Sequence, residues 1–294
     1  MRHFGSLSRY AAVLVFGLSM MATSASASSE GNPLAQRAVS IGGTITEILY
    51  ALGAEERIIA VDSTSSFPSE AASKPDVGYM RALSAEGILA QKPDLIIAED
   101  GSGPPPVLDI LNASEIPMVI IATPARGDAI GQKIRDVGAA VGLEGKAEVL
   151  ATKTEAELKT LSEEIARLDE PPKRVLFVLS LANGRIMAGG TDTEAAEIIR
   201  LAGGINAASE ISGYKPLSDE AVIAARPDVI LTMKRGNHQT STEEVFGLPA
   251  FQTTPAANDK ALVSMDGLLL LGFGPRTPSA VRELFRRLYP DGSN

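Results

Sequence analysis

The chain has 294 residues, a formal net charge of −9 and no cysteine. This length suits one large domain or two ordinary ones, and a hydrophobic content of 45% is enough to fill their cores. The negative charge argues against nucleic acid or an anionic membrane surface as the main partner, and the lack of cysteine excludes disulfides and thiolate metal sites.

The N-terminus has the three regions of an export signal. Residues 1–9 carry two arginines and no acid, residues 10–21 are apolar, and Ala25-Ser26-Ala27 offers small residues for cleavage. An uncleaved membrane anchor is the alternative, but the apolar run is short for a bilayer. We expect residues 1–27 to be a signal peptide cleaved near Ala27 and the mature protein to be periplasmic. Cleavage removes Arg2 and Arg9 and no acid, which takes the formal charge from −9 to about −11.

Residues 28–141 alternate short apolar runs with helical patterns. We predict strands at 37–41, 57–61, 94–98 and 117–122, and helices at 44–52, 107–113 and 130–141. Thr44 and Glu47 have the spacing of a capping box at the first of these helices, and Gly53 is placed to end it. Strands that are apolar on both faces indicate a parallel sheet covered by helices on both sides. We therefore assign residues 28–141 to an N-terminal α/β lobe.

A single long helix is predicted next. Residues 144–168 are rich in Ala, Glu, Lys and Leu and contain no proline, and Pro171-Pro172 closes the segment. No second long heptad segment is available to pair with it as a coiled coil, so we expect residues 142–170 to form a helix that links two lobes.

Residues 171–294 form the expected C-terminal lobe. They contain predicted strands at 175–180, 185–188, 229–232 and 261–264, and helices at 195–201 and 277–289. The predicted fold class is α/β, with two similar lobes built on mainly parallel sheets, joined by one long helix, and a ligand cleft between the lobes.

An internal repeat supports the similarity of the lobes. Five residue types of the N-terminal lobe recur in the C-terminal lobe at a constant offset of 134 residues (217 − 83). They are Leu83, Ser84, Glu86, Pro93 and Asp94, which recur as Leu217, Ser218, Glu220, Pro227 and Asp228. Glu86 and Glu220 thus form a matched pair of carboxylates, which suits docking to a two-fold partner with arginine pockets. The alternative is that each acid simply favours the first turn of a helix, which explains each one but not the symmetry.

Catalytic constellations are lacking. His3 and His238 are the only histidines, His3 leaves with the leader, and no Gly-x-Ser-x-Gly elbow, P-loop or dinucleotide glycine pattern is present. A zinc site with several His or Cys ligands is impossible by count. We therefore expect no enzyme activity.

Tyr79 and Arg81 are the first candidate binding residues. In an extended segment, residues two apart point to the same side, so a guanidinium hydrogen-bonded to the phenol would lower its pKa and stabilise phenolate. Phenolate is a ligand for Fe(III), including haem iron. A lone Tyr-x-Arg is also a weak motif, and on these residues alone a packed loop tyrosine beside a solvated arginine is the more common arrangement.

The segment Lys234-Arg235-Gly236-Asn237-His238 is the second candidate. It follows the predicted strand at 229–232, and ligands of open α/β sheets bind at the carboxyl ends of strands. Arg235 or Lys234 could pair with ligand carboxylates such as haem propionates, and His238 could be a further ligand. A solvated basic loop is the alternative.

Three motifs carry a resemblance to a known family. Gly-Gly-Thr-Ile-Thr-Glu-Ile-Leu-Tyr-Ala-Leu-Gly (42–53), Val-Gly-Tyr-Met-Arg-Ala-Leu-Ser-Ala-Glu-Gly (77–87) and Leu-Leu-Gly-Phe-Gly-Pro-Arg-Thr-Pro (270–278) resemble those of the periplasmic haem-binding proteins of bacterial haem ABC importers. These are helix-linked, class III-type substrate-binding proteins, and the resemblance covers nearly the whole mature chain.

The resemblance implies a monomeric haem carrier that serves an inner-membrane permease dimer and its ATPase. Tyr79 matches the family's axial tyrosine, Arg81 the residue that hydrogen-bonds the phenolate, and Arg235 an arginine near the bound haem. Glu86 and Glu220 match the glutamates that engage arginines of the permease dimer.

Two departures and one alternative accompany the resemblance. Leu181-Ala182-Asn183 stands where relatives that bind a haem pair have a histidine, which argues against a two-haem mode. Phe67 stands where relatives can have tyrosine, and we interpret it as cleft packing. The same fold also carries ferric siderophores or corrinoids; Tyr79 beside Arg81 favours haem, and a siderophore cleft with several Arg and Trp is not supported because the chain has no Trp.

Overall fold

The computed structural model describes residues 35–290 except residues 183, 235, 237 and 238. The predicted signal peptide, Arg235 and His238 lie outside the described residues. Within the described part, no helix is long and apolar enough to cross a membrane.

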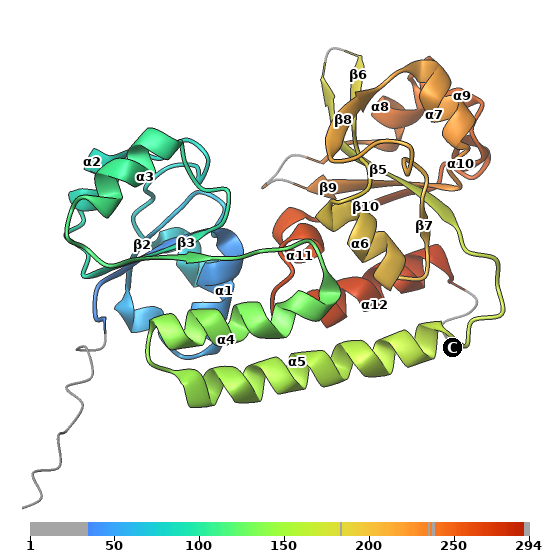
Figure 1. Ribbon diagram of the computed structural model, residues 1–294. Coiled ribbons are helices and arrows are strands. Elements are labelled where there is room, and N and C mark those ends of the chain that lie inside the picture. The colour runs from blue at the N-terminus through green and yellow to red at the C-terminus, as the bar shows by residue number, and fades with distance from the viewer. Residues whose placement is uncertain (1–34, 183, 235, 237–238, 291–294) are drawn as a thin grey trace, which may run out of the picture. The chain divides into compact units, whose positions relative to one another are not determined.

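The N-terminal lobe contains a parallel sheet with the strand order β2-β1-β3-β4 (Figure 1). The strands lie within one residue of the predicted runs, because each run is short, apolar and bounded by polar or turn-forming residues. They are β1 (Ala38–Ile41), β2 (Ile58–Val61), β3 (Leu95–Glu99) and β4 (Met118–Ile121).

Helices cover both faces of this sheet, as the apolar strands predict. Ala38 and Ile97 belong to the buried cluster that contains α1 and α4, whereas the alternate residues Val39 and Ile96 face the cluster that contains α2 and α3. The helical elements are α1 (Gly43–Ala51), α2 (Ala85–Leu89), α3 (Pro105–Asn112) and α4 (Ile130–Ala140), with short 3-10 turns η1 (Glu55–Arg57), η2 (Ser69–Ser73) and η3 (Gly127–Ala129).

The predicted capping box at the start of α1 is wrong. The cap position is Gly42, with φ of 111°, and no side chain caps the helix. The Thr44 hydroxyl instead donates to the carbonyl of Gly272 at 2.7 Å, and the Glu47 carboxylate accepts hydrogen bonds from Arg276. Both side chains therefore bind a distant segment of the chain instead of their own helix end.

The long helix α5 (Glu144–Ile165) is three residues shorter than predicted, since Ala166 begins a turn. Its 22 residues span about 33 Å. Arg135 of α4 is paired with Glu148 and Glu155 of α5, each at 2.7 Å. The other end of α5 packs on α12, so the helix contacts elements of both lobes.

The C-terminal lobe contains a mixed sheet with the order β10-β9-β5-β6-β8, and β7 pairs with β5 (Figure 1). β10, β9, β5 and β7 are parallel, whereas β6 pairs antiparallel with both of its neighbours, β5 and β8, so only the first sheet is wholly parallel. The strands are β5 (Arg174–Ala182), β6 (Arg185–Gly189), β7 (Ile205–Asn206), β8 (Tyr214–Leu217), β9 (Val229–Lys234) and β10 (Leu262–Asp266).

Helices also cover both faces of the second sheet. Phe177 of β5 packs into the cluster with α6, α11 and α12, whereas its neighbour Val178 packs into the cluster with α7 to α10. The helices are α6 (Glu194–Leu201), α7 (Asp219–Ala225), α8 (Thr242–Phe246), α9 (Pro249–Gln252), α10 (Pro255–Asn258), α11 (Gly267–Leu271) and α12 (Thr277–Leu288).

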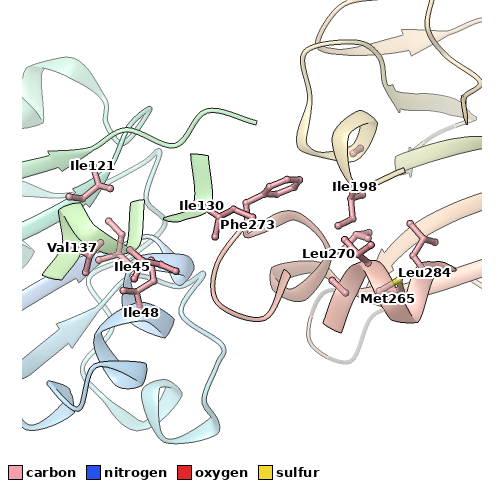
Figure 2. Packing of buried hydrophobic residues seen from close by; sticks show 14 of the residues in the cluster. Ile45, Ile48, Ile121, Ile130, Val137, Ile198, Met265, Leu270, Phe273 and Leu284 are labelled. Carbon is pink, nitrogen blue, oxygen red and sulfur yellow. The ribbon is translucent and has the colours of Figure 1, made fainter. Parts of the chain in front are cut away.

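One hydrophobic cluster joins the two lobes. Phe273, in the connection between α11 and α12, is 2% exposed, and Figure 2 shows it next to Ile130 of α4. The cluster continues on one side to Ile45 of α1 and on the other to Ile198 and Leu284 (Figure 2). The α11–α12 connection is therefore packed between elements of both lobes.

Candidate ligand-binding site

Asp62 organises the loops at the carboxyl edge of the first sheet. This buried side chain directly follows β2, and its carboxylate accepts hydrogen bonds from the backbone N–H of Gly42 at 2.9 Å and of Thr64 at 3.1 Å. The hydroxyl of Ser65 donates to it as well, at 3.1 Å. The loops after β1 and β2 are thus held together at the edge where parallel sheets bind ligands.

The segment that carries Tyr79 lies between the loops after β2 and β3. The N–H of Ser63 donates to the carbonyl of Gly78 at 3.0 Å, and the N–H of Gly103 donates to the carbonyl of Met80 at 2.9 Å. These bonds place Tyr79 at the same edge of the sheet.

Tyr79 and Arg81 are brought together, but not by an extended backbone. The N–H of Ala82 donates to the carbonyl of Tyr79 at 2.7 Å, so residues 79–82 form a turn, and the predicted extended geometry is wrong. This turn precedes α2, which begins at Ala85. Nη1 of Arg81 nevertheless donates to the phenol oxygen of Tyr79 at 3.2 Å, and the tyrosine is 45% exposed.

Phe67 lies in the loop after β2 and stacks on an arginine from the α11–α12 connection. Cζ of Arg276 is 3.4 Å from the centroid of the Phe67 ring. Nη2 and Nε of the same arginine donate to the Glu47 carboxylate at 2.7 and 3.0 Å. Arg276 lies in the motif at residues 270–278, but the sequence gave no indication of its contacts with Phe67 and Glu47.

Two oppositely charged side chains interact near this edge of the sheet. Lys133 of α4 is buried, and its Nζ donates to the carbonyl of Gly272 at 3.2 Å. Burial lowers the pKa of Lys133 and raises the pKa of Glu99, at the end of β3, while each charge counteracts the shift of the other. Lys133 thereby ties the α11–α12 connection to the N-terminal lobe.

Lys234 and Gly236 are the described residues of the second candidate segment. Lys234 ends β9 and is exposed, in register with Asp266 of β10. Arg235 and His238, which follow it, lie outside the described residues, so their predicted roles stay predictions.

Glu86 and Glu220 occupy the same local position in their two helices. Each is the second residue after a serine cap, since Ser84 Oγ accepts from the N–H of Gly87 at 3.3 Å and Ser218 Oγ accepts from the N–H of Ala221 at 3.2 Å. Both glutamates are exposed. The backbone N–H at the start of α7 lowers the pKa of Glu220, which keeps this carboxylate anionic.

The repeated aspartates have a structural role that sequence reasoning missed. The Asp94 carboxylate accepts from the N–H groups of Gln36 and Arg37, both at 2.9 Å, just before β1. The Asp228 carboxylate accepts from the N–H of Arg174 at 2.8 Å, at the start of β5. Each aspartate therefore accepts hydrogen bonds from backbone N–H groups at the start of an inner strand. The recurrence of both aspartates in the repeat is the sequence feature that could have indicated this role.

A surface hollow lies elsewhere. It has a volume of about 640 Å³ and lies between η3, α5 and α6, and it includes neither Tyr79 nor Phe67. Most of its charged lining residues are already paired, for example Arg200 with Glu197 at 2.7 Å. Across the described residues, no group of three or more His, Cys, Asp or Glu side chains could hold a metal ion.

The fold defines a class of protein, namely two α/β lobes joined by a long helix, with polar and aromatic side chains gathered at a sheet edge. Residues 39–268 match the family model described as periplasmic binding protein, and the chain belongs to this family.

Several relatives are similar over most of their length. The periplasmic heme-binding protein RhuT from Roseiflexus sp. RS-1 is 38% identical, with a TM-score of 0.83, and the match covers 88% of this chain and 99% of that one. The periplasmic heme-binding protein BhuT, solved in complex with two hemes, is 34% identical with a TM-score of 0.82, over 88% of this chain and 99% of that one. A vitamin B12-binding protein of Yersinia pestis (strain Pestoides F) is 29% identical, over 83% of this chain and 82% of its own length.

Proposed function

We propose that this protein is a periplasmic haem carrier that binds haem and delivers it to an inner-membrane ABC permease. The observation that carries the proposal is the hydrogen-bonded pair of Tyr79 and Arg81, exposed at a sheet edge, in a chain that is 38% and 34% identical to proteins described as heme-binding. Haem is the cargo, and it reaches a cleft between the lobes formed by residues 28–141 and 171–294, which the helix segment 142–170 joins.

The proposed chemistry uses few side chains. Once deprotonated, the Tyr79 oxygen would be a hard anionic ligand for Fe(III), and the Arg81 guanidinium, which hydrogen-bonds that oxygen, would balance its charge. Arg235 is proposed to pair with a haem propionate, on the grounds of its place in the sequence after β9.

Delivery is proposed to use Glu86 and Glu220. Each is exposed at the start of a capped helix, one in each lobe, so a two-fold permease dimer with arginine pockets can engage both. The permease works with its ATPase, and the carrier acts as a monomer. We propose modest lobe movement, since the Phe273 cluster and α5 both connect the lobes.

The proposal is for a carrier and not for an enzyme. Covalent and acid–base catalysis require a nucleophile next to a positioned base. The mature sequence offers a single histidine, His238, and no nucleophile elbow.

The test is an absorption titration of the mature protein with ferric haem. We expect one saturable haem per protein, with a five-coordinate, high-spin tyrosinate spectrum that disappears in Tyr79→Phe. Arg81→Ala should retain the spectral type and weaken binding about 10–100-fold, as loss of a partner that orients a metal ligand does. Tyr50→Phe, a half-buried tyrosine of the same lobe, is the matched control and should bind like wild type. An unchanged spectrum in Tyr79→Phe would move the iron ligand elsewhere.

A corrinoid or a ferric siderophore is the second candidate, because a vitamin B12-binding protein is 29% identical over most of the chain. A parallel titration with cobalamin separates the two. Saturable binding of cobalamin together with no saturable binding of haem would establish the second candidate in place of the first.

A further inference from the structure

Two aromatic side chains are exposed at one edge of the N-terminal sheet. Among the described residues, Phe67 at 39% and Tyr79 at 45% are the exposed aromatic side chains; the others are half-buried or buried. Both belong to loops at the carboxyl ends of the parallel strands, and these loops are hydrogen-bonded through Ser63 and Gly78 at 3.0 Å. Phe67 therefore leaves apolar surface in contact with water, in a loop that is hydrogen-bonded to the segment carrying Tyr79.

The Phe67 ring is held in place from one side. The Arg276 guanidinium lies over the ring with Cζ 3.4 Å from its centroid, which is a close cation–π contact. One face of the ring is therefore covered, and the exposed 39% of the residue is what remains for another partner.

Arg276 is itself fixed. Its Nη2, Nε and backbone N–H donate to the Glu47 carboxylate at 2.7, 3.0 and 3.2 Å, and Glu47 is only 5% exposed. The neighbouring Gly274 has no room for a side chain, since a Cβ there would lie 3.0 Å from Cγ2 of Thr44. The arginine therefore has little freedom to move away from the ring.

We propose that Phe67 is a stacking surface for the flat conjugated ring of the ligand, and that Arg276 is the positioning residue that fixes this ring. The inference rests on the proposed function and names a specificity-determining contact that does not involve iron. Tyr79 selects the metal, and Phe67 selects a planar, largely apolar macrocycle. Because Arg276 belongs to the α11–α12 connection, the position of the stacking surface depends on how that connection packs against Glu47.

Two ligands separate the stacking contact from iron ligation: ferric haem and metal-free protoporphyrin IX. We expect Phe67→Leu to weaken protoporphyrin binding about tenfold, a loss within the range for bases stacked on aromatic side chains. The same variant should keep the tyrosinate spectrum of bound haem. Tyr79→Phe should show the opposite pattern, with the haem spectrum lost and protoporphyrin binding nearly unchanged. Phe67→Tyr should restore protoporphyrin affinity because it restores a ring.

Arg276→Lys tests the positioning role. Lysine keeps the charge beside Glu47 but lacks the planar group that stacks on the ring, so protoporphyrin affinity should fall about threefold or more. A merely structural role would lower the melting temperature and leave the affinity of the folded protein unchanged. Ile110→Ala, which truncates a side chain 54% exposed on α3, is the control and should change neither affinity.

The outcomes are distinct. Wild-type affinity of Phe67→Leu for protoporphyrin, with haem ligation still lost in Tyr79→Phe, overturns this inference and leaves the proposed function standing. Failure of the wild-type protein to bind either haem or protoporphyrin overturns both.

Discussion

Replacing Glu47 by glutamine tests how strongly the α11–α12 connection is held to the N-terminal lobe. The substitution keeps the shape of the side chain and removes its charge. The carboxylate accepts three hydrogen bonds from Arg276, between 2.7 and 3.2 Å, and Glu47 is 5% exposed. Arg276 would then be left beside a neutral amide that offers one acceptor oxygen.

The expected loss follows from the burial of the two partners. Breaking a fully buried ion pair costs about 3–5 kcal/mol, because the remaining charge is left without compensation. The Arg276 side chain is 26% exposed and can recover part of its hydration. We therefore expect the free energy of unfolding to fall by about 2–3 kcal/mol, which lowers the melting temperature by about 4–10 °C for a protein of this size.

The assay is urea unfolding of the mature protein, with Arg282→Gln as the matched control. Arg282 pairs with Glu164 at 3.1 Å, but the two side chains are 40% and 45% exposed, so this loss should stay below about 1 kcal/mol. A double-mutant cycle with Arg276→Gln measures the coupling directly. If Glu47→Gln costs no more than Arg282→Gln, the pair between the lobes does not stabilise the fold and the reasoning is refuted.

Three further predictions concern the repeat and one sheet edge. Asp94→Asn and Asp228→Asn should each lower the free energy of unfolding by about 1–2 kcal/mol in urea, and the losses should add, because the two sites lie in different sheets. Gly42→Ala should cost about 2 kcal/mol or more in thermal unfolding, because φ is 111° and a Cβ would overlap the Glu99 side chain. The pKa of Glu220, followed by NMR, should lie below its usual value; its contribution to stability is present above the unfolded pKa and is lost as the pH falls through the folded pKa.

The glycine and glutamate predictions each have a control variant. Gly145→Ala, where nothing lies within 4 Å of an added Cβ in α5, should be neutral or stabilising by up to about 1 kcal/mol. Ser218→Ala should raise the pKa of Glu220 because the serine hydroxyl contributes to the shift. Strongly non-additive losses at the two aspartates, a Gly42→Ala variant as stable as Gly145→Ala, or a Glu220 pKa insensitive to Ser218→Ala would each contradict the corresponding argument.

Elements that are marked by a local pattern in the sequence were predicted. The four strands of the first sheet and the helix α5 were expected from apolar runs and composition. Strand β8 was not expected, since Pro216 within Tyr214–Leu217 discourages a strand assignment. The structure accommodates it because β8 lies at the edge of its sheet, where proline removes no essential ladder bond.

Contacts between distant residues account for the remaining errors. Thr44 and Glu47 fit a capping box by spacing, but their partners Gly272 and Arg276 lie 228 and 229 residues further along the chain. A local stretch of sequence does not include these partners and so cannot predict these hydrogen bonds. The Tyr79–Arg81 pair was predicted from the wrong backbone geometry for a related reason: hydrogen bonds to Ser63 and Gly103, in other loops, hold the segment that carries it.

The recurring residues of the repeat fall into two groups, according to whether the fold itself uses their side chains. Ser84 and Ser218 cap helices, and Asp94 and Asp228 satisfy strand donors, so their recurrence follows from the shared architecture of the lobes. The glutamates at 86 and 220 recur with the same spacing, yet both are exposed and neither takes part in a salt bridge among the described residues. A helix start favours an acid there but does not require one, because the serine already caps each helix. The fold of the described residues therefore does not account for this pair, and its recurrence is the reason we propose that a two-fold partner engages it.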